Sequence, residues 1–491
     1  MSRGRKLLQG AAWIYGSQVL TVLAQFAYAA VTSRLVGPEG FGSYAIALAV
    51  SGLVSLIAVG GIGQAVSRMV VIDDVRLRAL VTFALLVGLG AAALLWLTAP
   101  LWAALWGDPA AAPVLEVLTV SAFTAPLAGV GASLMRRQGS FRAIAILSLA
   151  ANLLGMFVGV MAVATWRSGT SLVVSAVVAQ VALLVGVLLL TKRRLWGVAW
   201  PKHAAGEVVF SANLTAVKIA EYLVGNILKF SVSRALGSAF FGYWNRADMV
   251  ATLPFQQVQT ALVQAVSPEF RNDIESSRRA HRVWTDMLVL VAWLVIPLCT
   301  LAAVVLPAVV PYLFGPGWEV TAQITTPLAL AAGMQTVSMV LSSAIETLGR
   351  YRWMWLTSSV LIVIQIFGAI MLFVVGDIAI AMACLIITQV ARHAIQIALC
   401  NNYGYIDVSS LLKNYLVIVV FAAVVGCEAL VTLSLVPVAM GEPFFWAIPV
   451  VLVTATASLT FIFRKHLPVV RVAARYGIGR SGGRTYAKQG A

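Results

Sequence analysis

Residues 33–67 read SRLVGPEGFGSYAIALAVSGLVSLIAVGGIGQAVS, and residues 233–267 read SRALGSAFFGYWNRADMVATLPFQQVQTALVQAVS. The two stretches align without a gap at an offset of 200 residues, and 12 of their 35 positions are identical. Both begin with Ser-Arg and both end with Gln-Ala-Val-Ser. Duplicated bundles of membrane helices are typical of transporters that have two lobes around a central path. The repeat therefore predicts a two-lobed transporter.

The composition indicates a membrane protein. Of 491 residues, 61% are hydrophobic and only 11% are charged, and the mean hydropathy is +0.93. Soluble globular proteins carry about 25% charged residues. We therefore expect an all-α polytopic membrane protein.

Apolar stretches of about 20 residues, the length that crosses a bilayer, predict about 14 transmembrane helices. The expected spans are residues 10–35, 41–62, 78–102, 114–134, 143–165, 171–190, 207–235, 246–266, 287–310, 320–344, 354–375, 378–400, 412–434 and 444–462.

The distribution of basic residues supports this count. The formal net charge is +16, and with a cytoplasmic N-terminus 27 of the 34 Lys and Arg residues fall in cytoplasmic segments. Basic residues gather on that side of membrane proteins, so a wrong count would invert the alternation partway along the chain. Both termini are expected in the cytoplasm, and the positive charge is explained without nucleic acid binding.

The repeat extends beyond the opening match. Thr124–Ala128 corresponds to Thr325–Ala329, and the turn Leu105-Trp106-Gly107 corresponds to Leu313-Phe314-Gly315. Spans 1–6 and 7–12 are therefore expected to be two copies in the same orientation, because six is even. The expected regions are an N-lobe (1–190), a cytoplasmic linker (191–206), a C-lobe (207–400), two added spans (401–463) and a basic cytoplasmic tail (464–491).

Polar residues in the first and seventh spans predict a central cavity. Gln18 and Gln25 lie on one face of span 1, and Lys218, Glu221 and Lys229 lie on the matching face of span 7. Charges inside a span almost always face the bundle interior or a water-filled cavity. The alternative for Lys218 and Glu221 is a structural pair at i, i+3. Lys229 has no carboxylate at i±3 or i±4 and is the stronger candidate for binding.

Other polar residues are weaker candidates with structural alternatives. Three arginines lie near the outer ends of spans, and they either face the cavity or reach out to the membrane interface. Gln256 and Gln264 hydrogen-bond either to sugar hydroxyls or to neighbouring helices. Isolated carboxylates are candidates for coupling to an ion. The arginines are Arg34, Arg234 and Arg246, and the coupling candidates are Glu221, Asp248 and Glu346.

Several classes of site are disfavoured. The sequence has no G-x-x-x-x-G-K-[ST] phosphate loop, no metal-ligand spacing among its four Cys and four His residues, and no nucleophile–base pattern. We expect no resident cofactor, no metal and no enzymatic activity.

The turn from Arg34 to Tyr44, its copy from Leu236 to Ala247, and Leu313–Trp318 resemble the polysaccharide transporter family of the multidrug/oligosaccharidyl-lipid/polysaccharide exporter superfamily. The resemblance runs from about residue 5 to 465. It implies an oligosaccharide flippase that moves an undecaprenyl-diphosphate-linked oligosaccharide across the bacterial cytoplasmic membrane. A diphosphate needs cationic partners, and Lys218 and Lys229 suit that role.

Alternatives to this function remain open from sequence. A lipid II flippase shares the expected fourteen spans, a multidrug or cation antiporter shares the superfamily, and a membrane glycosyltransferase or polymerase is disfavoured by short outer loops. Membrane lipids, H+ or Na+ as a coupling ion, and a polymerase with other polysaccharide-assembly proteins are the candidate partners.

Overall fold

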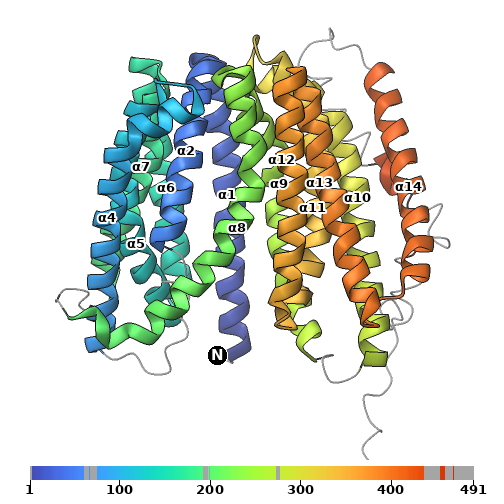
Figure 1. Cartoon of the computed structure of the whole chain (residues 1–491), viewed down its shortest axis with the longest axis horizontal. Coiled ribbons are helices and arrows are strands. Elements are labelled where there is room, and N and C mark those ends of the chain that lie inside the picture. The colour runs from blue at the N-terminus through green and yellow to red at the C-terminus, as the bar shows by residue number, and fades with distance from the viewer. Residues whose placement is uncertain are drawn as a thin grey trace, which may run out of the picture. The chain divides into compact units, whose positions relative to one another are not determined.

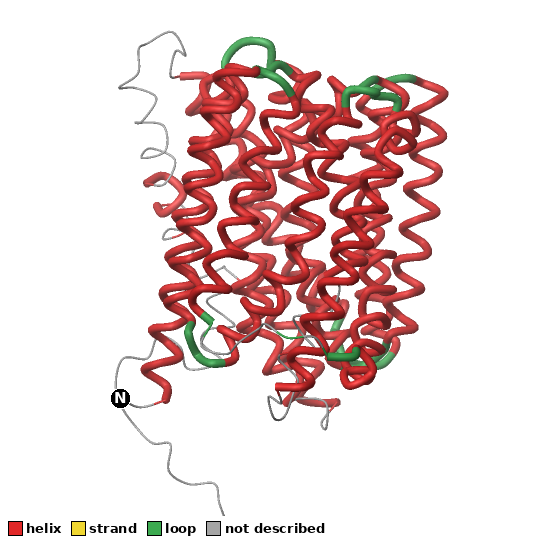
Figure 2. The backbone as a smooth tube through the Cα atoms, turned by 90° about the vertical axis from the view of Figure 1, so that its left-hand side faces the viewer, coloured by secondary structure: helices red, strands yellow, loops and turns green. Residues whose placement is uncertain are grey.

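The computed structural model contains long α-helices joined by short turns, with no strand among the residues it describes (Figure 2). It describes residues 3–59, 66, 74–191, 197, 199–272, 277–435, 454–458, 460 and 468. Within some helices the side chains are not described, chiefly residues 3–12, 203–217 and 263–280. The predicted fourteenth span (444–462), the basic tail (464–491) and the side chain of Gln264 thus lie outside or mostly outside the described part of the chain.

Each of the first thirteen predicted spans corresponds to one α-helix. The helices are α1 (Arg3–Leu35), α2 (Pro38–Val59), α4 (Asp74–Trp106), α5 (Ala111–Arg137), α6 (Phe141–Trp166), α7 (Gly169–Leu190), α8 (Ala205–Leu236), α9 (Ser238–Asn272), α10 (Ser277–Phe314), α11 (Glu319–Thr347), α12 (Tyr351–Val375), α13 (Ile378–Asn402) and α14 (Val408–Leu435).

Ten of these helices are long and apolar enough over their described residues to cross a membrane. Together with the composition, this makes the chain a multi-pass membrane protein. Helices α1, α8 and α9 are outside that set, and they are the helices on which the sequence places the polar residues. The set is α2, α4, α5, α6, α7, α10, α11, α12, α13 and α14.

The chain divides into two compact units. Unit 1 comprises residues 1–257, 306–328 and 355–388, and unit 2 comprises residues 258–305, 329–354 and 389–491. Helices α9 to α13 each pass from one unit to the other, so the unit boundaries do not follow the predicted lobes. The division into six-helix lobes stays a prediction.

In unit 1, α1, α2 and α4 to α7 run side by side (Figure 1). Helix α5 packs against α2, α4 and α7, and α6 packs against α1 and α7. Helix α8 starts near α4, after the short 3₁₀ helix η1 (Pro201–Ala204), and continues along α2. One apolar core in this unit combines residues of both repeats, including Phe41 from the first and Val250 and Phe314 from the second.

Unit 2 is held by close contacts among α10, α11 and α14. The rings of Trp293 and Phe421 lie 4.6 Å apart between α10 and α14. Gly333 of α11 faces Cys299 of α10 so closely that an added Cβ would overlap that side chain. Small residues at such crossings let helices approach without side chains between them.

Candidate functional site in the paired repeats

The repeated turns of unit 1 pack on one another reciprocally. A Cβ on Gly42 would overlap the backbone carbonyl of Ser238, and a Cβ on Gly242 would overlap the carbonyl of Pro38. These four residues are two pairs at the 200-residue offset. Contacts in which i meets j and j meets i are the sign of a two-fold arrangement. The duplication is therefore visible in three dimensions, and glycine is required because backbone meets backbone.

A second reciprocal contact surrounds the first. Arg34 lies against Gly315 and donates from Nη2 to the carbonyl of Tyr312 at 2.6 Å. Its copy Arg234 lies against Gly107, where an added Cβ would meet the guanidinium. Gly107 and Gly315 have φ of 78° and 85°, a left-handed conformation that glycine adopts without strain. We call this set the crossed turns: residues 33–42, 233–242, 105–108 and 312–318.

Aromatic residues fill the crossed turns from both sides. Trp318 donates from Nε1 to the carbonyl of Ser33 at 3.0 Å and meets the ring of Phe41 at a centroid distance of 5.5 Å. In the other copy, Ser233 donates to the carbonyl of Trp106 at 3.1 Å, and the Trp106 ring stacks 5.5 Å from Phe241. Arg34 and Arg234 thus have structural partners in both copies, a role not foreseen when they were considered as cavity residues.

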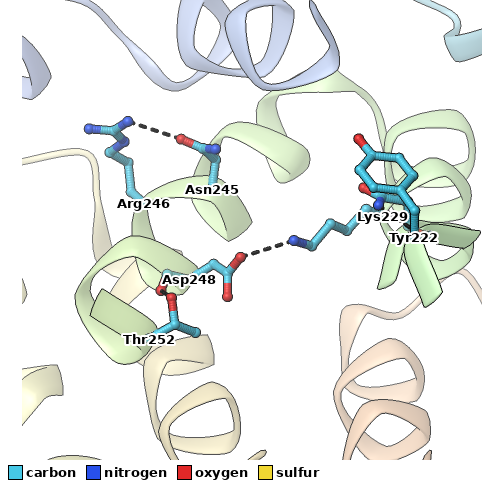
Figure 3. A network of polar contacts seen from close by, with 7 residues as sticks. Tyr222, Lys229, Asn245, Arg246, Asp248 and Thr252 are labelled. Carbon is cyan, nitrogen blue, oxygen red and sulfur yellow. Dashed lines mark hydrogen bonds and ion pairs between the residues drawn. The ribbon is translucent and has the colours of Figure 1, made fainter. Parts of the chain in front are cut away.

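The second copy differs from the first by a charged group between α8 and α9 (Figure 3). Lys229 Nζ lies 2.9 Å from Asp248 Oδ2, and their side chains are 27% and 29% exposed. Thr252 donates to the main-chain carbonyl of Asp248 at 2.6 Å. At the offset of 200, Lys229 and Asp248 match Ala29 and Leu48, so the first copy is apolar at this place.

This pairing changes the interpretation of Lys229. The sequence pattern within the helix gives Lys229 no acidic partner, and the structure supplies one from the next helix, 19 residues along the chain. Helical spacing reveals partners on the same helix and is silent about neighbours across a packing interface. Asp248, expected as a candidate for ion coupling, is the residue that neutralises Lys229.

Arg246 is the cation of this group without an acidic partner. It is 6% exposed, its guanidinium lies 4.1 Å from the centre of the Phe41 ring, and it donates to Asn245 Oδ1 at 3.0 Å. Its Nε is buried without a hydrogen-bond partner among the described residues, and the ion pairs found among those residues are Lys218–Glu221 and Lys229–Asp248, neither of which includes Arg246. Figure 3 shows Arg246 pointing away from the Lys229–Asp248 pair.

An unpaired guanidinium in an apolar span is energetically costly. Desolvating a charge costs several kcal/mol, and a desolvated cation–π contact returns about 2 kcal/mol. Each copy contributes to the surroundings of this charge: Arg246 and Asn245 come from α9, and Phe41 comes from α2. Arg246 is therefore a buried cation without a carboxylate partner among the described residues, and an anion can neutralise it.

The remaining predicted residues are not all near this group. Lys218 and Glu221 form the i, i+3 ion pair that was the alternative to cavity lining, at 3.0 Å and with side chains 49% and 45% exposed. The buried Oε1 of Gln18 has no hydrogen-bond partner within the described residues. Gln25 is half-buried, whereas Gln256 and Glu346 are exposed.

Three residues around the charged group were not singled out from sequence. Asn245 is the hydrogen-bond partner of Arg246, and Phe41 provides its ring. Tyr222 donates from its hydroxyl to the main-chain carbonyl of Ala49, which joins α8 to α2. The run Asn-Arg-Ala-Asp at 245–248, where the first copy reads Ala-Ile-Ala-Leu, was the available signal, and it points to Asn245.

The family of the chain follows from a match over more than half its length. A family model described as a polysaccharide biosynthesis protein matches residues 31–323, which include the whole charged group and the crossed turns. The chain belongs to this family.

Two curated relatives agree with the family. The chain is 22% identical to the lipopolysaccharide biosynthesis protein WzxC of Escherichia coli (strain K12), over 71% of this chain and 72% of the relative. It is 25% identical to the succinoglycan biosynthesis transport protein ExoT of Rhizobium meliloti (strain 1021), over 66% of each chain.

Solved structures show the same fold. The inward closed conformation of the lipid II flippase MurJ matches with a TM-score of 0.68 over 93% of this chain and 99% of that one, at 12% identity. An inward-facing multidrug resistance MATE transporter of the MOP superfamily matches with a TM-score of 0.59 over 82% of this chain and 95% of that one, at 14% identity. This chain thus shares its architecture with both of these proteins.

Proposed function

We propose that the protein moves an undecaprenyl-diphosphate-linked oligosaccharide across the bacterial cytoplasmic membrane by alternating access, for the synthesis of cell-surface polysaccharide. It acts as a transporter and not as an enzyme. Both termini lie in the cytoplasm. The family, the relatives WzxC and ExoT, and the fold shared with MurJ and MATE transporters support this role.

The observation that carries the proposal is the unbalanced charge of Arg246. Lys229 is matched by Asp248 and Lys218 by Glu221, while Arg246 has no acidic partner among the described residues. A diphosphate presents oxygens that a planar guanidinium binds in a bidentate manner. The anionic headgroup would satisfy the charge that the protein leaves unpaired. We assign Arg246 as the principal diphosphate contact and Lys229 as the second.

Lys229 then contributes through an exchange of partners. In the structure it is bound to Asp248, so a phosphate oxygen must displace that carboxylate. The displaced carboxylate of Asp248 is free to take up H+ or Na+, which would link the substrate to an ion. Amides on α1, Gln18 and Gln25, are the proposed contacts for sugar hydroxyls, and the lipid tail remains in the bilayer.

The test uses a strain that lacks the gene. Loss of the protein should accumulate a lipid-linked oligosaccharide on the cytoplasmic side, identified by mass spectrometry of the glycan, and the wild-type chain should clear it. Arg246→Gln should fail to clear it at normal protein levels. Lys413→Gln changes a cation on α14 outside this group and is the matched control.

The same strain separates this function from its rivals. If no oligosaccharide accumulates and the chain instead rescues cells depleted of their lipid II flippase, the proposed substrate is wrong. Altered drug susceptibility without a change in surface polysaccharide would instead indicate a multidrug exporter.

A further inference from the structure

Unit 2 contains a polar chain that the proposed substrate site does not use. His393 of α13 lies between Ser338 of α11 and Tyr415 of α14. Its Nδ1 is 3.2 Å from Ser338 Oγ, and its Nε2 is 3.1 Å from Tyr415 Oη. The rings of His393 and Tyr415 also stack, with centroids 5.8 Å apart and planes 15° apart. Three helices therefore meet at one titratable group.

The hydrogen bond of Ser338 to its own helix indicates which nitrogen of His393 carries the proton. Ser338 Oγ lies 2.9 Å from the main-chain carbonyl of Met334 and donates its single proton there. Toward His393 it can then only accept, so Nδ1 carries a hydrogen. In a neutral imidazole Nε2 is the acceptor, so the Tyr415 hydroxyl donates to it. Every donor in this chain has an acceptor while His393 is neutral.

Protonation of His393 would reverse one of these bonds. A proton from water that binds Nε2 turns this nitrogen into a donor, and the Tyr415 hydroxyl can no longer point its own proton at it. The Tyr415 oxygen can accept from the imidazolium, but its proton must then find another acceptor. The bond to Ser338 is unchanged, because Nδ1 is a donor in both states. The rearrangement therefore falls on α14, the helix beyond the two six-helix repeats.

No charged side chain in the described residues forms an ion pair with His393. Ionisable side chains do lie elsewhere on the elements that pack together in unit 2, namely α10, α11, α13 and α14. They are His281, Arg282 and Asp286 on α10, Glu346 on α11, Arg392 on α13, and Lys413 and Glu428 on α14. Among the described residues, the groups that contact the ring nitrogens of His393 are therefore Ser338 and Tyr415, both uncharged hydroxyls.

We propose that His393 is a proton-binding site, and that its protonation reverses the Tyr415 hydrogen bond and alters how α14 is held against α13. The ligand is H+, delivered by water and released to water with no other reactant. The consequence for transport rests on the proposed function, since it makes His393 a group through which H+ drives export. Histidine is the side chain that most readily exchanges a proton in the physiological range, and burial disfavours its charged form, so proton uptake at His393 is expected on the acid side of neutrality.

The first experiment is independent of any substrate. The full-length protein, labelled with ¹⁵N-histidine and held in lipid nanodiscs, is followed by NMR between about pH 3.5 and 8, because burial disfavours the imidazolium. One histidine signal, absent in His393→Gln, should change from an Nδ1–H tautomer to imidazolium. In Tyr415→Phe the same signal should titrate with a shifted midpoint. A His393 signal that keeps one neutral tautomer over the whole range would overturn the proposal.

The second experiment measures export against pH. Wild-type export should vary by up to about tenfold per pH unit on the limb where one group titrates. His393→Gln, which keeps a neutral hydrogen-bonding side chain, should flatten that slope to less than about twofold. His281→Gln on α10 is the matched control and should keep the wild-type slope.

The two experiments distinguish the possible failures. If His393 titrates but the His393→Gln variant keeps the wild-type pH profile, the site does not couple to transport and the proposal is wrong. If wild-type protein exports no lipid-linked oligosaccharide, the proposed function fails, and the NMR titration still decides whether His393 binds protons.

Discussion

The turn between α1 and α2 and the turn between α8 and α9 make equivalent close contacts and differ in chemistry. Gly42 and Gly242 make equivalent close approaches, and Arg34 and Arg234 lie on equivalent glycines. Behind these shared contacts, the first copy has alanine, isoleucine and leucine where the second has Lys229, Arg246 and Asp248. After the duplication, packing required both copies to stay alike, while charge accumulated in one.

Such asymmetry indicates a division of labour. Burying charge reduces stability unless it is matched, so two fully charged copies would double the cost. The first copy contributes Phe41, whose ring lies beneath Arg246, and so supports the charge that the second copy carries. Four experiments test this difference between the copies.

The largest effect is expected from filling the glycine crossing. Gly42→Val or Gly242→Val would place carbon atoms where the facing backbone carbonyl lies, so the two helix starts must separate. We expect almost no folded protein in the membrane, measured by immunoblot and detergent-stable chromatography. Gly37→Ala is the matched control, because nothing lies within 4 Å of its added Cβ. Equal protein levels for Gly42→Val and Gly37→Ala would contradict the close approach.

The second substitution makes the copies alike at the unpaired cation. Arg246→Ile installs the residue of the first copy, Ile46. Export should fall at least about 100-fold, because an interaction of charge with a diphosphate is lost, while protein levels stay normal or rise. The measurement is surface polysaccharide per molecule of membrane protein. Normal export in Arg246→Ile would remove Arg246 from the substrate site.

A double-mutant cycle tests the ion pair of the second copy. Asp248→Leu alone leaves Lys229 unpaired and should lower the free energy of unfolding by about 1–3 kcal/mol. The loss is modest because the pair is partly exposed. Adding Lys229→Ala recreates the apolar pair of the first copy and should restore most of that stability, but not export. Strictly additive losses of stability would show that the two side chains are not coupled.

The smallest effect is expected from one hydrogen bond of the crossed turns. Ser233→Ala removes the bond to the Trp106 carbonyl and should cost about 1 kcal/mol. Ser33 is the equivalent of Ser233 in the first copy. Trp318 donates to the main-chain carbonyl of Ser33 and not to the Ser33 hydroxyl. Ser33→Ala should therefore leave that bond intact and lower the melting temperature less than Ser233→Ala does.

The spans and the repeat were predictable because both depend on patterns within the chain. Hydropathy placed thirteen helices that the structure contains, and the offset of 200 placed residues such as Gly42 and Gly242 in equivalent turns. The helices extend beyond the predicted spans, as in α10 (Ser277–Phe314) against 287–310, because polar helix ends continue past the apolar layer.

The partners of the charged residues were not predictable in this way. The pair Lys218–Glu221 was foreseen since both lie on one helix three residues apart. The pair Lys229–Asp248 depends on how α8 and α9 face each other, and the Arg246–Phe41 contact depends on the docking of one repeat against the other. Neither contact can be predicted from the spacing of residues within one helix.

The crossed turns also limit the order in which contacts can form while the chain is being synthesised. The main-chain carbonyl of Ser33 accepts a hydrogen bond from Trp318, which is synthesised 285 residues later. Arg34 donates to the carbonyl of Tyr312, which is synthesised 278 residues later. At ordinary rates of synthesis this delay is on the order of 15 to 60 s. During that time the first repeat is already in the bilayer with one of its packing surfaces uncovered. The insertion machinery or neighbouring lipids must keep that surface from pairing wrongly, and damage to the second repeat will therefore leave the first one unfinished.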